Sequence, residues 1–169
     1  MTDPELVVRP ATLADIDAIV HVGHTTWPVA YARLAGDDYV QMGLAKWWTP
    51  EATRPLVEAG RCTVAEFDGT VVAVAAVGPL DGNLVLFRLY VLPTHQGDGI
   101  GARLLRRVEE QARYTGHRTL RLPYLDGNDG AARFYARHGY HELEREPGAP
   151  GIPDQVWVIK DLWDDEEQR

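Results

Sequence analysis

A short glycine-rich turn carries the clearest chemical signal in this sequence. It lies between an apolar segment, Leu84–Val91, and a segment with helical periodicity that begins at Gly99. Glycine lets consecutive backbone N–H groups point in one direction, and the first turn of a helix adds N–H groups without internal partners and the positive end of the helix dipole. Such groups together bind phosphate with little help from side chains. The turn reads Gln96-Gly97-Asp98-Gly99-Ile100-Gly101, and Ala102 follows it.

Other phosphate-binding motifs fit this turn less well. A Walker P-loop needs Lys and then Ser or Thr after its last glycine, whereas Ala102 and Arg103 stand here. The dinucleotide fingerprint G-x-G-x-x-G/A is met by Gly97, Gly99 and Ala102, but in that fold the glycines follow the strand almost directly. Residues 92–96 intervene here, and only one clear βαβ crossover is expected. A glycine turn without a ligand is a third interpretation, which the long helix behind the turn disfavours.

A second motif lies in a short helix expected over Asn128–His138. It combines an asparagine, small residues, a Phe-Tyr pair and a glycine with an aromatic neighbour. The two motifs, in this order, resemble those of the GNAT superfamily of N-acetyltransferases, and the resemblance extends over residues 63–162. The matching positions are Leu89-Tyr90-Val91, Gln96-x-x-Gly99-x-Gly101 and Asn128-x-x-Ala131-x-x-Phe134-Tyr135-x-x-x-Gly139-Tyr140.

The resemblance implies a fold and a co-substrate. The fold is mixed α/β (α+β): a mostly antiparallel sheet that splays between its two central strands and has helices on both faces. Acetyl-CoA lies in the cleft, and no metal is implied. Backbone N–H groups hold the pyrophosphate. The backbone of the strand before the turn pairs with the amides of the pantetheine arm, as it would with a neighbouring strand. Asn128 hydrogen-bonds that arm or caps its own helix, and the two roles can coexist. The implied coenzyme-binding residues are Leu89, Tyr90, Val91, Gln96, Gly97, Asp98, Gly99, Ile100, Gly101, Ala102 and Asn128.

Tyr135 is the residue to which the resemblance gives a catalytic role. Acetyl transfer to an amine requires a neutral nucleophile, stabilisation of the developing oxyanion, and a proton for the leaving thiolate. A phenol with a pKa of about 10 stays protonated at neutral pH and can donate to sulfur. In the family a tyrosine at this place is commonly the general acid; packing against coenzyme or core is the alternative role for Tyr135. By resemblance, a backbone N–H near Val91 is the oxyanion donor.

The sequence does not reveal the general base. Arg88 cannot accept a proton at neutral pH, and its strand holds no carboxylate. The open candidates are His24, Glu66, Asp81 and Asp126, or a chain of water molecules. We expect His95 to position the phosphate turn. The other histidines, His21, His117, His138 and His141, show no metal-ligand spacing and are expected to have packing or surface roles.

Acceptor specificity is expected to come from the N-terminal third, where aromatic residues gather. Together with Asp37 and Asp38 they would suit an amine with a positive charge. The alternative is that at least three of the five aromatics form core. These five are Trp27, Tyr31, Tyr39, Trp47 and Trp48. The loop Pro147–Pro153 is a further candidate for the border of the acceptor pocket.

Periodicity predicts the elements that position these residues. Strands are expected at Leu6–Arg9, Cys62–Phe67, Thr70–Val77, Leu84–Val91, Thr119–Tyr124, Tyr140–Arg145 and Gln155–Asp161. The helix Gly99–Thr115 should bury a stripe of Ile100, Leu104, Leu105, Val108 and Ala112, while Arg103, Arg106, Arg107, Glu109 and Glu110 mostly face water.

The N-terminal helices are harder to delimit. Thr12 is expected to cap a helix that buries Leu13, Ile16, Ile19 and Val20 on one face. Pro28 is expected to open a second helix, which Gly36 and Gly43 break. Another helix begins at Thr49-Pro50 and ends at Gly60.

Composition limits the class of protein. The 169 residues suit one domain over residues 1–163 with a charged tail at 164–169. The net charge of −8 disfavours nucleic acid as a partner, and no run approaches the ~20 apolar residues that span a membrane. The single cysteine, Cys62, excludes an internal disulfide and suits a small core residue in a cytoplasmic protein. A homodimer is common in GNAT-like folds, but no feature of the sequence demonstrates one.

These observations predict an N-acetyltransferase. It would move an acetyl group from acetyl-CoA to a primary amine, on a small molecule or a peptide, by direct attack in a ternary complex. The alternative is a non-catalytic acyl-CoA-binding sensor or subunit, which the lack of an evident base supports.

Overall fold

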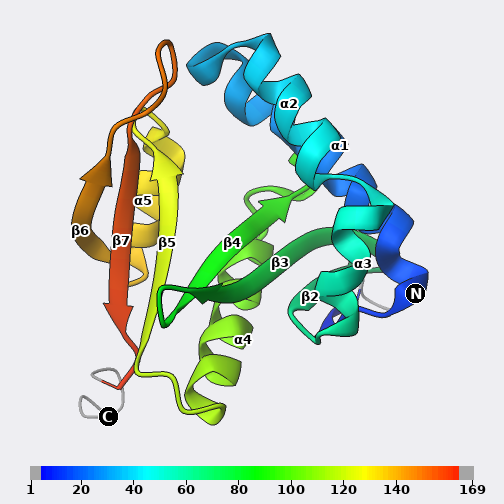
Figure 1. Cartoon of the computed structure of the whole chain (residues 1–169). Coiled ribbons are helices and arrows are strands. Elements are labelled where there is room, and N and C mark those ends of the chain that lie inside the picture. Colours follow the sequence, from blue (N-terminus) through cyan, green and yellow to red (C-terminus); the bar gives the residue numbers. More distant parts are fainter. Residues whose placement is uncertain (1–4, 164–169) are drawn as a thin grey trace.

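A seven-stranded sheet forms the centre of the protein. The computed structural model describes residues 5–163 (Figure 1), so the predicted charged tail lies outside the described residues. The strand order is β1-β2-β3-β4-β5-β7-β6, with β4 and β5 parallel and all other neighbours antiparallel. The strands are β1 (Leu6–Pro10), β2 (Cys62–Phe67), β3 (Thr70–Leu80), β4 (Asn83–Val91), β5 (Thr119–Leu125), β6 (His141–Glu146) and β7 (Gln155–Asp161). The predicted strands and the mixed sheet are therefore confirmed.

Helices cover both faces of the sheet. On one face lie α1 (Ile16–Ala35), α2 (Asp37–Trp47) and α3 (Pro50–Glu58), which share an apolar cluster with β2 and β3. On the other face α4 (Ile100–Tyr114) packs on the sheet, and side chains of α5 (Asp129–Arg137) join the same cluster. Short 3-10 turns, Leu13–Asp15 and Pro93–His95, precede α1 and α4. The sheet thus separates two cores.

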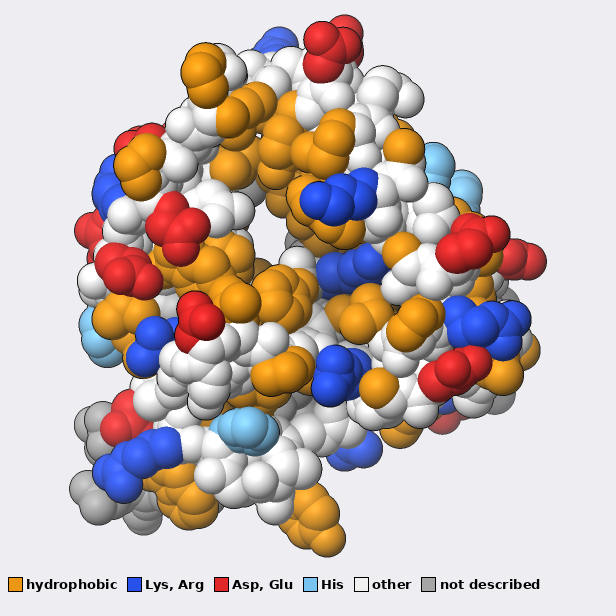
Figure 2. Space-filling model, viewed as in Figure 1, with side chains coloured by type: hydrophobic (Ala, Val, Ile, Leu, Met, Phe, Trp, Pro, Cys, Tyr) orange, Lys and Arg blue, Asp and Glu red, His pale blue; other side chains and the backbone are white. Residues whose placement is uncertain are grey.

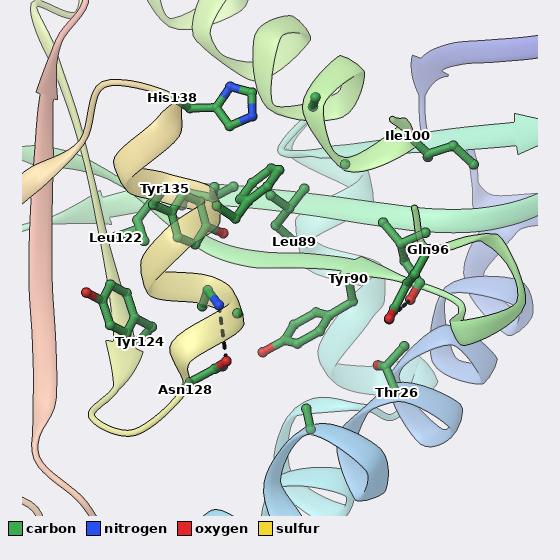
Figure 3. A pocket seen from close by; sticks show the side chains of 18 of the residues that line it. Thr26, Leu89, Tyr90, Gln96, Ile100, Leu122, Tyr124, Asn128, Tyr135 and His138 are labelled. Carbon is green, nitrogen blue, oxygen red and sulfur yellow. Dashed lines mark hydrogen bonds between the residues drawn. The ribbon is translucent and has the colours of Figure 1, made fainter. Parts of the chain in front are cut away.

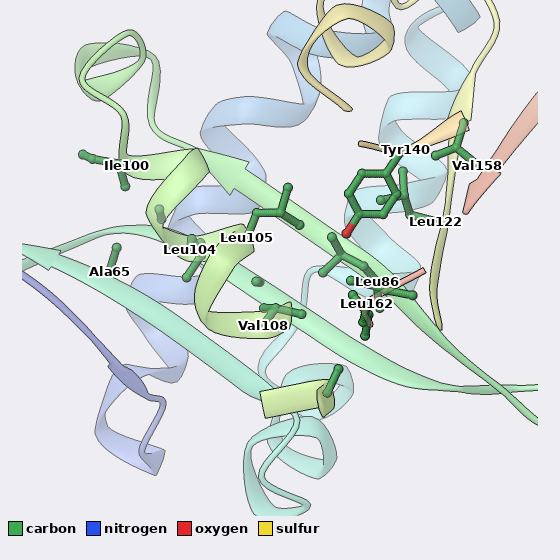
Figure 4. Close-up of a cluster of buried hydrophobic side chains, with 14 of the residues drawn as sticks. Ala65, Leu86, Ile100, Leu104, Leu105, Val108, Leu122, Tyr140, Val158 and Leu162 are labelled. Atoms are coloured by element: carbon green, nitrogen blue, oxygen red, sulfur yellow. The ribbon is translucent and has the colours of Figure 1, made fainter. Parts of the chain in front are cut away.

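The core beneath α4 follows the predicted apolar stripe. Ile100, Leu104, Leu105, Val108 and Ala112 are all buried, and they pack against β4, β5 and β7 (Figure 4). The helical period places these positions on one face, so their burial fixes how α4 lies on the sheet.

The sheet opens between β4 and β5. These parallel strands share one register pair, Val85 with Arg121, and diverge beyond it. Next to this opening β4 carries a bulge, because Ala76 faces Arg88 while Val77 faces Leu86, which leaves Phe87 without a partner in β3. Bulges of this kind redirect side chains beside functional sites. The predicted splay is confirmed.

The predicted breaks in the N-terminal helices are partly wrong. Pro28 lies inside α1 rather than at the start of a new helix. A proline there removes one intrahelical hydrogen bond, but the helix continues through it, with Val22 and Trp27 buried on its inner side. Gly43 does not break α2 either. A Cβ at this position would lie 2.0 Å from the Trp27 ring, so glycine lets α2 approach α1 closely.

The predicted burial of Leu13 and the predicted exposure of Glu109 are also wrong. Leu13 is 51 % exposed, because it lies in the 3-10 turn before α1 and not on the buried face of the helix. Glu109 is buried on α4, where its carboxylate accepts a hydrogen bond from the Tyr140 hydroxyl (2.7 Å) and pairs with Lys160 (3.2 Å). Partners far away in the sequence compensate for the burial of this charge.

Candidate active site

A cavity of about 800 Å³ occupies the opening between β4 and β5. Residues of α1, β4, the glycine turn, β5 and α5 line it (Figures 2 and 3). The predicted site residues on its wall are Leu89, Tyr90, Val91, Gln96, Gly97, Gly99, Ile100, Gly101, Ala102, Asn128 and Tyr135. Asp98 is exposed beside the wall and does not line it. The fold thus brings the two sequence motifs, which are separated along the chain, to one cavity.

The glycine turn holds the start of α4 open toward this cavity. Gly97 and Gly99 have φ of 90° and 78°, a region that residues with a Cβ rarely adopt. The Gln96 side chain donates to the Val91 carbonyl (2.9 Å) and closes the turn. Arg103 N–H makes the first bond back to the turn, to the Gly99 carbonyl (3.1 Å). The three N–H groups before it lie at the open N-terminus of the helix, where an anion is stabilised.

Asn128 caps α5 at the other wall of the cavity. Its Oδ1 accepts a hydrogen bond from Ala131 N–H (3.2 Å), and the residue is half-buried (Figure 3). Because the cap uses only the side-chain oxygen, the amide nitrogen keeps its two donor hydrogens. The capping role is confirmed, and contact with a ligand stays a prediction.

Tyr135 enters the cavity from α5. Its ring contacts Phe134 (5.1 Å between centroids), Tyr140 (5.6 Å) and Tyr124 (6.4 Å), which fix its direction. Burial, and then the neighbouring Tyr31, raise the pKa of Tyr135 above its usual value. The phenol is therefore protonated at neutral pH and can act as a donor.

Tyr90 faces Tyr135 across the cavity (Figure 3). Its hydroxyl lies 2.8 Å from the hydroxyl of Tyr31, which links β4 to α1. Burial raises the pKa of Tyr90 to about 12, and that of Tyr31 well above its ordinary value. Three protonated phenols thus surround the centre of the cavity.

The candidate general bases lie elsewhere. None of the four lines this cavity. The exposed His24 ring bonds to the Trp48 carbonyl (2.9 Å), and Glu66 and Asp126 form ion pairs with Arg9 (3.0 Å) and Arg145 (3.3 Å). Asp81 lies exposed in the turn before β4. The carboxylate candidates therefore serve structural or surface roles.

The sequence reasoning missed several wall residues. His138 lines the cavity against the Phe134 ring (4.6 Å), and burial lowers its pKa. Its spacing of four from Phe134 places both on one helix face, which was an available signal. Phe87 and Tyr124 also line the cavity, because the bulge and the splay expose them there. His95 lines the cavity, and its Nδ1 is 2.9 Å from the Thr94 hydroxyl; its role in positioning the turn stays a prediction.

The N-terminal aromatics divide as expected between core and cavity. Trp27 and Trp48 are buried and Tyr39 packs against them, so three of the five belong to the core. Tyr31 lines the cavity. Asp37 and Asp38 are exposed at the start of α2 and do not line it, and neither does any residue of the loop Pro147–Pro153.

Comparison with known proteins identifies the family. Residues 58–142 match the domain family described as "Acetyltransferase (GNAT) domain", which covers half of the chain. The protein belongs to the GNAT family of acetyltransferases. The GNAT match contains both the glycine turn and the Asn128–Gly139 motif, so the predicted resemblance is confirmed.

Individual relatives agree with this assignment. Thialysine N-epsilon-acetyltransferase of Mus musculus is 35 % identical over 66 residues, which are 39 % of each chain. The match thus spans about two fifths of that relative's length. Spermidine N(1)-acetyltransferase of Thermoplasma acidophilum is 20 % identical over 89 % of this chain and 96 % of its own. The crystal structure of PaiA N-acetyltransferase from the same organism, in complex with coenzyme A, superimposes with a TM-score of 0.82 at 18 % identity, over 93 % and 99 % of the two chains.

In residues 5–163, helices are too short or too polar to cross a lipid bilayer. The same residues contain no cluster of three or more His, Cys, Asp or Glu that could hold a metal ion.

Proposed function

We propose that this GNAT protein transfers the acetyl group of acetyl-CoA to a primary amine by direct attack in a ternary complex. One observation carries the proposal. The open N-terminus of α4, which suits a diphosphate, and the hydroxyl-bearing Tyr135 line the same cavity. The site therefore combines an anchor for the coenzyme with a proton donor at its centre.

The residues present fit the coenzyme along its length. The N–H groups from Gly97 to Ala102 would bind its pyrophosphate, since helix N-termini favour anions. Beyond the Val85–Arg121 pair, the edge of β4 toward β5 has no strand partner among the described residues, so its backbone can pair with amide groups as a strand edge does. The free amide hydrogens of Asn128 would meet the same arm from α5. Acetyl-CoA supplies an activated thioester when bound there.

Tyr135 would protonate the departing sulfur. The phenol keeps its proton at neutral pH, so it can donate a hydrogen bond to the sulfur as negative charge develops there and can pass its proton to the thiolate as the carbon–sulfur bond breaks. The proton lost by the attacking nitrogen would then restore the phenol. Phe134 beside it packs against His138 and Tyr135 and holds the end of α5 in place.

The acceptor nitrogen must be neutral when it attacks. No Asp or Glu of the described residues lines the cavity, although His95 and His138 do. The proton of an ammonium group would leave through water before attack. Binding both substrates side by side would then supply much of the acceleration. The relatives named for thialysine and spermidine, both of them N-acetyltransferases, support an amine as acceptor.

A thiol-release assay with acetyl-CoA and a panel of amines tests this function. We expect release of free coenzyme A above background hydrolysis with at least one amine, and loss of that activity in Tyr135→Phe but not in Tyr114→Phe, which changes a 93 % exposed tyrosine on α4. Tight binding of acetyl-CoA without turnover of any amine would favour the alternative, a non-catalytic sensor. Absence of acetyl-CoA binding in calorimetry would contradict both.

A further inference from the structure

Buried nitrogen atoms without hydrogen-bond partners mark one side of the sheet. Among the described residues four such side-chain atoms occur, and all are N–H donors: Trp27 Nε1, Arg88 Nη1, Arg121 Nε and Trp157 Nε1. A buried donor without an acceptor costs about 1–3 kcal/mol, and more when it is charged, so native proteins rarely keep them without a reason.

These four donors lie on the face of the sheet opposite α4. Trp27 belongs to α1, and the Arg88 guanidinium stacks on Trp48 (4.2 Å to the ring centroid), which is in the same apolar cluster. On β5 and β7, the neighbours of Arg121 and Trp157 in sequence are buried beneath α4, so alternation places these two side chains on the other face. The unpartnered donors therefore lie on the side of the sheet where α1 lines the cavity.

Arg88 is the most telling of them. It is 8 % exposed, and one arm of its guanidinium donates to the Trp47 carbonyl at the end of α2 (2.5 Å), while Nη1 has no partner. Its titratable neighbours, Cys62 and Tyr90, provide no counter-charge, because burial raises their pKa values to about 11 and about 12. A buried cation without an anion is costly, and it binds a carboxylate strongly when one arrives.

Arg88 lies beside the cavity but is not itself part of the wall. Phe87 and Tyr90, on either side of Arg88 along β4, line the cavity wall. The bulge turns the Phe87 side chain toward the same face of the sheet as Arg88. Gly78 lies two residues after Ala76, the partner of Arg88 in β3, and a Cβ on Gly78 would lie 3.2 Å from the Phe87 ring. Arg121 stands on the facing strand, at the point where the strands separate. Figure 2 shows basic side chains along one side of the central hollow.

We propose that the acceptor is an amine that carries a carboxylate, and that Arg88 binds this carboxylate. The inference rests on the proposed acetyltransferase function and names the class of its acceptor, an amino acid or a similar amino carboxylate. Nη1 is closed from solvent and Arg88 does not line the cavity, so binding requires a local movement that opens a path to the guanidinium. A diamine, in contrast, would bring a second cation toward Arg88 and Arg121.

Matched pairs of acceptors test this proposal on the unaltered protein. L-phenylalanine is compared with phenethylamine, and L-methionine with 3-(methylthio)propylamine, so that each pair differs by the carboxylate; spermidine is the polycation. We expect kcat/KM to be at least about tenfold higher for the amino acid of a pair, which corresponds to about 1.4 kcal/mol. Equal or better turnover of the decarboxylated amines, or of spermidine, would overturn the inference while leaving the acetyltransferase function intact.

A variant separates recognition from support of the fold. Arg88→Gln should lower kcat/KM for the amino acid at least tenfold, which is the scale of a lost charge-assisted contact. The kcat/KM for the decarboxylated amine of the same pair should change less than threefold, and the KM for acetyl-CoA should stay unaltered. Arg107→Gln, an equal loss of charge on exposed α4, is the control. An equal decrease for both members of a pair would show a structural role for Arg88 and contradict the proposal.

Binding measurements keep the two hypotheses distinguishable. If no amine is turned over although acetyl-CoA binds, the proposed activity fails, and calorimetry with the coenzyme A complex still tests the carboxylate preference. N-acetyl-L-phenylalanine should then bind at least tenfold more tightly than N-acetylphenethylamine. The absence of this difference overturns the inference.

Discussion

The hydroxyls of Tyr31 and Tyr90 lie 2.8 Å apart and join α1 to the end of β4. This contact connects the N-terminal helices with a strand that lines the cavity. Around it Trp27 contacts both rings, at 4.7 Å and 6.5 Å between centroids. The position of α1, and with it one wall of the cavity, thus depends on an aromatic cluster with a hydrogen bond at its centre.

Tyr31→Phe should destabilise the protein by about 1–3 kcal/mol, since it leaves the Tyr90 hydroxyl buried without this partner. The double variant with Tyr90→Phe should lose less than the sum of the single losses, because the second change removes the unpaired group. Urea unfolding followed by circular dichroism measures the three values. Tyr39→Phe, in the same cluster, is the control. Burial is the only cause that raises the pKa of Tyr39, with no contribution from a hydrogen bond such as the one that joins Tyr31 and Tyr90. Strict additivity would show that the two hydroxyls do not interact.

Tyr135→Phe should lower kcat by roughly 10²-fold, the scale of lost general acid catalysis. The KM for acetyl-CoA should change less than threefold, since the ring contacts with Phe134, Tyr124 and Tyr140 remain. Steady-state kinetics with a turned-over amine gives both numbers. An unchanged kcat would assign Tyr135 to packing.

The sequence was most informative where structure depends on neighbours in the chain. The stripe of α4, the strand Gln155–Asp161 and the cap at Asn128 are all present as predicted, because helical period, alternation and capping are local properties. The two motifs could be assigned to one cavity only through the family resemblance, since no local rule shows that β4 and α5 meet.

Tertiary contacts explain what the sequence did not show. The burial of Glu109 depends on Lys160, which is 51 residues away, and the tolerance of α2 for Gly43 depends on the Trp27 ring. Arg88 looked like an ordinary strand residue that could not act as a base. Its missing counter-charge becomes visible only when Trp47 and Trp48 cover it.

Gly99→Val should weaken the binding of coenzyme A at least tenfold. Gly99 has φ of 78° at the start of α4, where a residue with a Cβ costs about 1–2 kcal/mol and moves the N–H groups of the turn. Gly116→Val places the same residue at φ of 87°, at the other end of α4. Both variants should lose similar stability, but only Gly99→Val should lose affinity in calorimetry. Equal affinity in the two variants would contradict the phosphate-binding role of the turn.

Asp15→Asn should destabilise the protein in a pH-dependent way. Hydrogen bonds from Arg9 (2.7 and 2.9 Å), opposed in part by burial, lower the pKa of Asp15 to about 2. The pKa of Asp15 in the folded protein lies below its value of about 3.9 in the unfolded chain. The ionised carboxylate therefore adds about 2 kcal/mol to the free energy of unfolding above pH 4, and this contribution is lost as the pH falls toward 2. The difference from the wild type in urea unfolding should therefore shrink between pH 5 and pH 3, whereas the exposed Asp17→Asn should show little difference throughout. A difference that stays constant over this range would show that the charge of Asp15 is not its source.

Glu109→Met should destabilise the protein by about 3–5 kcal/mol, since it removes the carboxylate that faces a buried lysine and accepts from Tyr140. Replacing Lys160 by Met as well should recover part of the loss, because two apolar side chains fill the space without a buried charge. Glu110→Met, at the exposed neighbouring position of α4, should change stability by less than about 0.5 kcal/mol. Urea unfolding of the single and double variants gives the coupling between the two charges. A double variant as unstable as the sum of the single changes would mean that the pair contributes nothing as a pair, and that α4 is held to β7 by its apolar stripe alone.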